Sequence, residues 1–135
     1  MSRNSTVTSI AVVGAGPGGY GAAFLAADRG LDVTLIDPEP NPGGVCLYRG
    51  CIPTKALLYA ADVISESRRA EEIGISFSDP DIDIGRLRSW KEKTVEKLTG
   101  GLGFLTKKRD IRYIQGRARF RDSQTLDIIP EEGEA

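Results

Sequence analysis

A glycine-rich turn, the six residues Gly-Ala-Gly-Pro-Gly-Gly from Gly14 to Gly19, constrains the fold of this chain more than any other feature. It follows the apolar run 10–13, which is typical of a short buried strand, and it leads into the small and apolar residues 19–29, which suit a helix. A second β-branched run, 33–36, reads as a strand that ends at Asp37. Strand, helix and strand in such quick succession predict a parallel, right-handed βαβ unit.

The glycines of this turn are those that a dinucleotide phosphate site requires. Gly14 permits the tight turn, Gly16 lets the backbone approach a pyrophosphate, and Gly19 lets the helix pack close to the strand. The helix N-terminus offers unpaired N–H groups to the phosphates, and an acidic residue at the end of the second strand binds a ribose hydroxyl. The turn alone does not distinguish FAD from NAD. The residues predicted to bind the dinucleotide are Gly14, Gly16, Pro17, Gly18, Gly19 and Asp37.

Two longer helices are predicted in the middle of the chain, over residues 54–72 and 84–108. The glycines near the end of the second helix predict that its last turns are irregular. The apolar faces are expected at Leu57, Ala60, Ala61 and Ile64 on the first helix, and at Val95, Leu98, Leu102 and Leu105 on the second; the weakening glycines are Gly100, Gly101 and Gly103.

Three short strands are predicted after these helices, over 111–115, 117–121 and 125–129, with the last two joined as a hairpin. The whole pattern predicts an α/β fold with a parallel sheet, followed by the start of an antiparallel β-meander. A chain of 135 residues is long enough for one compact domain but not for two. The meander should lead back into the parent sheet, so we expect an incomplete domain.

The composition limits the binding partners and the cellular compartment that we expect for the protein. The net charge of -1 indicates no attraction to nucleic acid or to an anionic membrane. The uncharged stretch from Asn4 to Ala27 contains five glycines and a proline, which argues against both a spanning helix and a signal peptide. Two cysteines are too few for a disulfide-stapled secreted fold. We therefore expect a cytoplasmic protein.

The two cysteines, Cys46 and Cys51, are five residues apart. On a regular helix this spacing rotates them by about 140°, whereas a disulfide needs Cα atoms within about 7 Å and facing Cβ vectors. The backbone must therefore depart from a straight helix if the two bond. Gly50 allows this, and Pro53 cannot donate a hydrogen bond to the carbonyl of Arg49. The pair is predicted at a distorted helix start, where the dipole lowers thiol pKa values.

Three other interpretations of the cysteine pair are a zinc site, a structural disulfide and two unrelated buried cysteines. A zinc site needs about four ligands, and the sequence has no histidine and no third cysteine, so we predict no metal site. A structural disulfide is disfavoured in a reducing cell. Two unrelated buried cysteines are the default for a lone pair at this spacing, and only the surrounding residues argue against that interpretation.

The run Gly43-Gly44-Val45-Cys46, followed by Cys51-Ile52-Pro53-Thr54-Lys55, resembles the class I pyridine nucleotide–disulfide oxidoreductases. That family includes dihydrolipoyl dehydrogenase, glutathione reductase and mercuric reductase. Residues 51–58 are most similar to the dihydrolipoyl dehydrogenases, and the resemblance extends over essentially the whole chain. The chain departs from it at Tyr48-Arg49, where the family commonly has Asn-Val, and at Asp37, where Glu is frequent.

The resemblance implies a Rossmann-like FAD-binding domain in an enzyme that passes electrons between a dithiol such as dihydrolipoamide, the cysteine pair, FAD and NAD. It implies that Cys46 is the interchange thiol and that Cys51 lies against the flavin ring, with Lys55 near flavin N5. Gly14, Gly16 and Gly19 would hold the pyrophosphate, Asp37 the adenosine ribose, and Gly116 a backbone position beside the adenine. The remaining cofactor contacts that the resemblance implies are Gly44 and Val45.

The resemblance also implies a catalytic base and two further domains that lie outside residues 1–135. The family's catalytic base is a histidine of a C-terminal dimerisation domain, and NAD binds to a second nucleotide fold. Residues 1–135 would then be the N-terminal part of the FAD-binding domain of a homodimer, inactive alone. Two alternatives stay open: a reductase for another disulfide (the glutathione type) or for Hg(II), and a non-catalytic nucleotide-binding or redox-sensing module.

Overall fold

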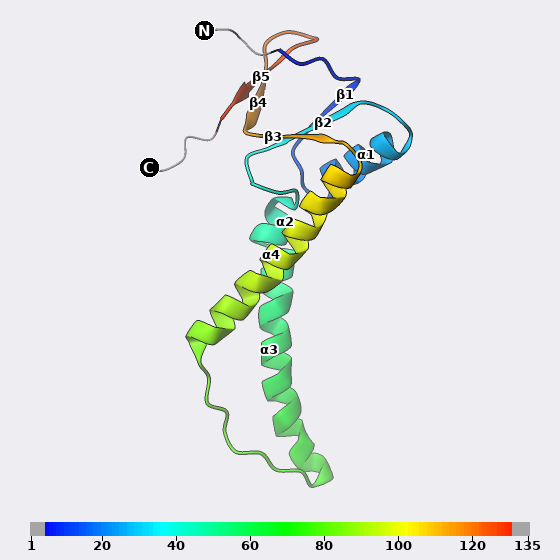
Figure 1. The fold of residues 1–135 in the computed structure, drawn as a ribbon. Coiled ribbons are helices and arrows are strands. Elements are labelled where there is room, and N and C mark those ends of the chain that lie inside the picture. The colour runs from blue at the N-terminus through cyan, green and yellow to red at the C-terminus, as the bar shows by residue number, and fades with distance from the viewer. Residues whose placement is uncertain (1–4, 131–135) are drawn as a thin grey trace.

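The computed structural model describes residues 5–130, which form an α/β head from which two long helices project (Figure 1). No helix in this part of the chain is long and apolar enough to cross a membrane. The elements, in chain order, are β1 (Ile10–Val13), α1 (Pro17–Asp28), β2 (Val33–Asp37), α2 (Gly44–Tyr48), α3 (Cys51–Arg69), the 3-10 helix η1 (Ala70–Ile73), α4 (Ile84–Lys108), β3 (Arg112–Gln115), β4 (Arg117–Phe120) and β5 (Leu126–Ile129).

Two separate sheets confirm the predicted α/β architecture. The first has the order β1-β2-β3 and is parallel throughout, with Val12 opposite Leu35 and Leu35 opposite Tyr113. The connection from β1 through α1 to β2 is the predicted βαβ unit. The second sheet is the β4–β5 hairpin, which is antiparallel as predicted. The carboxyl ends of β1 and β2 meet at one edge of the sheet, beside the start of α1.

The core of the head lies between α1 and one face of the parallel sheet. Leu35 and Ala23 are fully buried there, because the small side chain of Ala23 lets α1 approach the sheet closely. The opposite face carries Thr34 and Ile36, and a hollow of about 910 Å³ separates it from the β4–β5 hairpin. This second face is therefore only partly filled.

Helix α1 begins and ends where its sequence dictates. Pro17 occupies the first turn, two residues before the predicted start, because its missing N–H would have no helical partner there. At the other end Gly30 adopts φ +82°, and its N–H donates to the carbonyl of Ala27, while that of Leu31 donates to Ala26. This is a Schellman motif, in which the glycine adopts the left-handed conformation that ends the helix.

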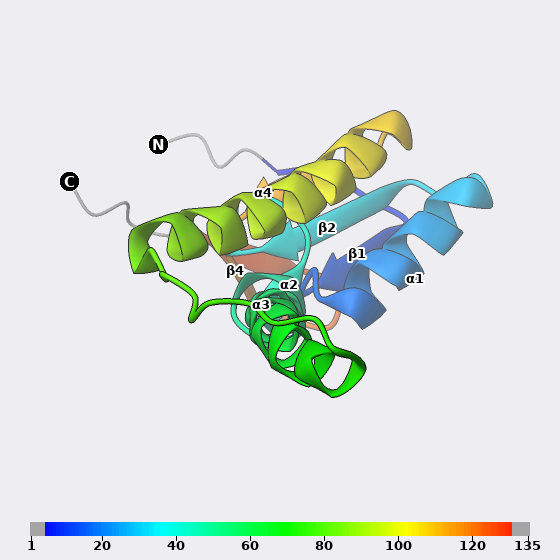
Figure 2. The same ribbon diagram turned by 90° about the horizontal axis from the view of Figure 1, so that it is seen from below.

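Helices α3 and α4 cross and pack against each other near the head, and their far ends diverge (Figures 1 and 2). The predicted range of α4 is confirmed, but its predicted irregular end is wrong: the helix runs unbroken through its three glycines. The predicted apolar faces are only partly confirmed: Leu57 and Leu98 are each more than two-fifths exposed, whereas Ile64 on α3 and three residues of α4 are partly buried, namely Val95, Leu102 and Leu105. The buried positions are instead small residues: Ala56 on α3, and Thr99, Gly103 and Thr106 on α4.

Close packing explains the small residues of α4. A Cβ atom at Gly103 would overlap the side chain of Asn41, which belongs to the segment between β2 and α2. Contacts at Gly103 therefore offset the intrinsic cost of glycine in a helix, which is about 1 kcal/mol. Large apolar residues do not fit on the face of α4 that contacts Asn41. The spacing of the leucines in the sequence therefore could not predict which face of α4 is buried.

Candidate functional site

The glycine turn joins the end of β1 to the start of α1. The N–H of Gly14 donates to the carbonyl of Ile36 at 2.8 Å, and Gly14 has φ +91°, a conformation that favours glycine. A Cβ atom at Gly19 would overlap the carbonyl of Gly14, so the helix can approach the strand only with glycine there. These contacts agree with the predicted steric roles of Gly14 and Gly19. Their contact with a phosphate stays a prediction.

The turn leaves open space where a phosphate is expected. A Cβ atom built at Gly16 or Gly18 meets no atom within 4 Å. Gly18 and Pro17 are exposed at the start of α1, whose first N–H groups have no helical acceptor. The absence of side chains at Gly16 and Gly18 thus keeps the helix N-terminus accessible to an anion.

Asp37 is the second component of the candidate site, and it is 6% exposed. One carboxylate oxygen accepts a hydrogen bond from the N–H of Ala15 at 2.6 Å, and the other accepts from the N–H of Glu39 at 2.9 Å. Asp37 therefore fixes the glycine turn and the segment that follows β2, a role that the sequence analysis missed. A carboxylate has about four acceptor positions, so further positions remain for a ribose hydroxyl.

The glycine pair before the first cysteine packs against this turn. The N–H of Gly43 donates to the carbonyl of Ala15 at 2.8 Å. A Cβ atom at Gly44, which has φ +58°, would lie 2.6 Å from the Cα atom of Gly16. The glycine turn and the start of α2 are therefore in direct backbone contact, which places the two sequence motifs in one candidate site.

The cysteines lie on either side of a break between two helices. Cys46 is in the five-residue helix α2, and Cys51 is the first residue of α3. The break falls at Arg49 and Gly50, which confirms that the backbone departs from a straight helix. Cys46 is partly buried and Cys51 is exposed, and both are free thiols. A redox disulfide between them is a prediction that follows from their closeness and from the family resemblance.

The pKa of the Cys46 thiol is raised above its ordinary value, contrary to the expected effect of a helix dipole. The largest cause is a hydrogen bond with the Cys51 thiol, followed by burial and by the charge interaction with Cys51. The backbone of Cys51 and the positive charge of Lys55 act in the opposite direction. The effect of the Cys51 sulfur on the pKa is larger than these two effects, because a shared hydrogen bond stabilises the protonated thiol.

The other predicted site residues lie around these two motifs. Lys55 is exposed one helical turn after Cys51, and Val45 is 70% exposed beside Cys46. Gly116 is buried, and its N–H donates to the carbonyl of Asp37 at 2.9 Å. A Cβ atom added at this position would lie 2.7 Å from the carbonyl oxygen of Ile129, so close backbone packing explains this glycine without a ligand.

Sequence reasoning also missed a set of side chains that surround the segment after β2. Tyr48 and Arg49 reach this segment from the turn between Cys46 and Cys51, which we call the redox turn after its predicted role, and Tyr113 reaches it from β3. The one signal in the sequence was that Tyr48-Arg49 departs from the family's usual pair. Their partners, Glu39 and Asn41, had no recognisable motif.

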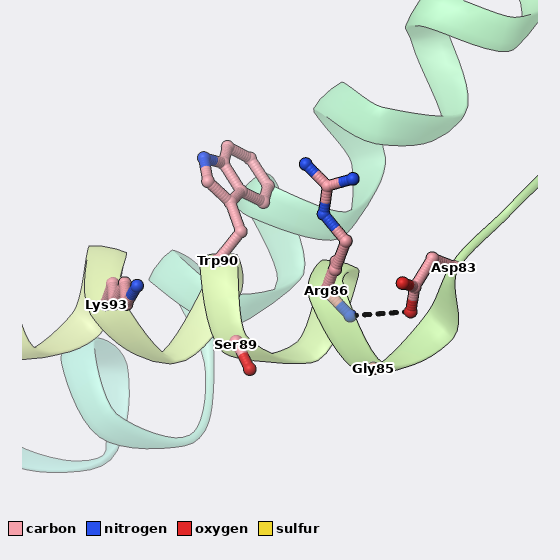
Figure 3. Close-up of a pocket in the computed structure, with 6 residues that line it drawn as sticks. All are labelled: Asp83, Gly85, Arg86, Ser89, Trp90 and Lys93. Carbon is pink, nitrogen blue, oxygen red and sulfur yellow. Dashed lines mark hydrogen bonds between the residues drawn. The ribbon is translucent and has the colours of Figure 1, made fainter.

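A hollow of about 490 Å³ at the start of α4 is separate from this site (Figure 3). Asp83 caps the helix there by accepting a hydrogen bond from the N–H of Arg86 at 2.9 Å. The residues that line it include no cysteine and none of the glycine turn. They are Asp83, Gly85, Arg86, Ser89, Trp90 and Lys93.

Comparison with known proteins gives consistent results. The family described as pyridine nucleotide-disulphide oxidoreductase matches residues 8–135. A dihydrolipoyl dehydrogenase of Buchnera aphidicola is 48% identical over 93% of this chain, and one of Vibrio cholerae is 47% identical over 92%. A dihydrolipoyl dehydrogenase of Halobacterium salinarum is 47% identical over 93% of the chain. In each case the chain spans 26% of the relative's length.

Proposed function

Because the chain belongs to the pyridine nucleotide-disulphide oxidoreductase family, we propose that it carries the FAD site and the redox-active cysteines of a dihydrolipoyl dehydrogenase. The observation that carries the proposal is the backbone contact between the two motifs: Gly43 donates to Ala15, and Gly44 packs on Gly16. This contact brings a dinucleotide turn next to two thiols. A phosphate site or a thiol pair alone would not require it.

The described residues fit the adenosine diphosphate part of FAD. Open space over Gly16 and Gly18 suits a pyrophosphate, and the start of α1 supplies donors. Asp37 lies at the carboxyl end of β2, where a ribose is held in this class of fold. Bound FAD would supply a two-electron carrier next to the thiols. In the proposal Lys55 contributes a positive charge close to that carrier.

The cysteine pair would exchange two electrons with a dithiol. In the oxidised pair, one thiolate of dihydrolipoamide attacks the Sγ atom of Cys46; a bond to the substrate forms and the Cys46–Cys51 bond breaks. The second substrate sulfur then attacks the first, which closes the lipoamide disulfide and leaves both cysteines reduced. Overall the dithiol loses two electrons and two protons, which appear in NADH and one released proton.

The wider enzyme is part of the same proposal. In it, residues 1–135 are the N-terminal part of the FAD-binding domain, and the NAD-binding and dimerisation domains lie elsewhere in a cytoplasmic homodimer. The alternatives are a reductase for glutathione disulfide or for Hg(II), which would use the same thiols, and a non-catalytic redox module. The identities near 47% to dihydrolipoyl dehydrogenases favour the lipoyl substrate over these.

An assay of the full-length protein on three substrates tests the proposal. We expect NAD-dependent oxidation of dihydrolipoamide, with much weaker turnover of glutathione disulfide and Hg(II). Replacing either cysteine, as C46S or C51S, should reduce turnover by at least about 1,000-fold, because the disulfide can no longer form. A full-length protein that retains no flavin, or a C51S variant with normal turnover, would refute the proposal.

A further inference from the structure

Tyr48 lies between the two cysteines, but its hydroxyl is bonded to the segment after β2. It accepts a hydrogen bond from the N–H of Asn41 at 3.2 Å and donates one to the carbonyl of the same residue at 3.1 Å. Both backbone groups of Asn41 are thus satisfied by one side chain. The ring also contributes to the close packing around Gly43, where a Cβ atom would lie 3.2 Å from the Tyr48 ring.

Arg49, the other residue between the cysteines, bonds to the same segment. Its guanidinium lies 2.5 Å from the carboxylate of Glu39. The Arg49 side chain is 64% exposed, whereas that of Glu39 is only 19% exposed. Neither Tyr48 nor Arg49 donates a hydrogen bond to a thiol in the described residues. Both are directed toward the scaffold, which does not favour a role in substrate contact.

The segment that receives these contacts is itself held firmly. The Tyr113 hydroxyl donates to the carbonyl of Glu39 at 2.7 Å, and the Gln115 amide donates to that of Pro38 at 3.0 Å. On its far side, the Asn41 side chain fits against Gly103 of α4. Residues 38–41 are therefore fixed by β3 and α4, independently of the redox turn.

The redox turn, by contrast, has little support of its own. Helix α2 has only five residues, and neither α2 nor α3 has a side-chain hydrogen bond at its N-cap. Short helices without caps are marginal in isolation. The position of Cys46 relative to Cys51 thus depends on contacts that the turn makes with the rest of the head.

Resting on the proposed function, we propose that Tyr48 and Arg49 are positioning residues for the redox pair. They tie the turn between Cys46 and Cys51 to residues 38–41, which fixes the distance between the two sulfurs. The Arg49–Glu39 pair has one well-exposed partner, Arg49, so solvent screens it and its contribution to global stability is modest. Its loss should therefore change the thiol–disulfide equilibrium of the pair more than the melting temperature.

The experiment uses the full-length flavoprotein and a glutathione redox buffer. We would measure the equilibrium constant for oxidation of the cysteine pair in wild type, Y48F, R49M and E39Q, together with the melting temperature of each. Y48F retains the ring and removes both bonds to Asn41, while R49M and E39Q break the ion pair from opposite sides. R69M, which breaks the exposed Arg69–Glu66 pair of α3, is the matched control.

We expect each of Y48F, R49M and E39Q to shift this equilibrium constant by about twofold to tenfold, with R69M unchanged. The ion-pair variants R49M and E39Q should lose little thermal stability, whereas Y48F should also lower the melting temperature, because it leaves the N–H and the carbonyl of Asn41 without their partner. The charge swap E39R/R49E should restore the wild-type constant, whereas E39R alone and R49E alone should not. No shift, or a shift that follows the melting temperature and is not restored by the swap, would overturn the proposal. Since the readout requires no lipoyl substrate, failure of the proposed activity would be seen separately.

Discussion

At the scale of single residues, the chemistry of the site depends on how the two sulfurs affect each other. The Cys46 thiol is partly buried and shares a hydrogen bond with Cys51, which raises its pKa, while the Lys55 charge lowers it. In the reduced pair the Cys46 thiol therefore holds its proton more firmly than an isolated thiol does. Reactivity of Cys46 as a thiolate should depend directly on these two neighbours.

Removing the Cys51 sulfur should make Cys46 more acidic. We expect the C51A variant to shift the pH midpoint for alkylation of Cys46 by iodoacetamide to lower pH, because the largest cause of its raised pKa is lost. The measurement is the alkylation rate of the Cys46 peptide against pH in the reduced protein. K55Q serves as a control of opposite sign, because it removes a charge that lowers the pKa. An unchanged midpoint in C51A would contradict this account.

Single residues also mark the limit of what the sequence reveals about the site. The steric roles of Gly14 and Gly19 were predictable, because backbone geometry at a glycine turn depends on neighbours only a few positions away. The hydrogen bonds of Asp37 to Ala15 and Glu39 were not, since a carboxylate chooses among several nearby donors only in three dimensions. The direction of the Cys46 pKa was wrong because the dipole argument ignored the second sulfur.

At the scale of elements, α4 shows how packing overrides propensity. Its N-cap Asp83 and its basic last turn, Lys107 and Lys108, mark both ends of the helix in the sequence. The glycines at Gly100, Gly101 and Gly103 suggested irregular last turns, yet only Gly103 is buried, against Asn41. Three glycines that look alike in the sequence therefore have different roles.

Alanine substitutions should separate these glycines. G100A and G101A add a methyl group that meets no atom within 4 Å, so each should stabilise the protein by about 0.5–1 kcal/mol through helix propensity. G103A should destabilise it by about 1–3 kcal/mol, because the added methyl group displaces Asn41. Urea denaturation of the three variants measures both effects. An equally stabilising G103A would show that Asn41 does not pack on the helix.

At the scale of the whole molecule, the chain exposes much more surface than a compact protein of its size. Its accessible surface is 10044 Å², whereas a compact monomer of 14.6 kDa exposes about 6,900 Å². Several apolar side chains of α3 contribute, with exposures between 44% and 62%: Leu57, Leu58, Tyr59 and Val63. The hollow between the parallel sheet and the β4–β5 hairpin indicates a second incompletely buried region.

Residues 1–135 expressed alone should accordingly be less stable than the same residues within the full-length protein. We expect them to retain no flavin on gel filtration and to bind a hydrophobic dye, because apolar surface on α3 and on the sheet stays uncovered. The full-length protein should retain flavin and bind little dye. A yellow, NADH-oxidising preparation of residues 1–135 would contradict both this expectation and the proposed division into domains.

The two hydrogen bonds of Asp37 have a consequence for anyone who wishes to redesign this protein. Changing nucleotide preference usually begins at the acidic residue after the second strand, since that residue contacts the ribose. Here a neutral or basic replacement would also release the N–H of Ala15, and Ala15 in turn accepts from Gly43 beside the redox turn. A substitution that changes the cofactor preference would therefore also change the reactivity of the thiols. A design would first need another acceptor for the N–H of Ala15.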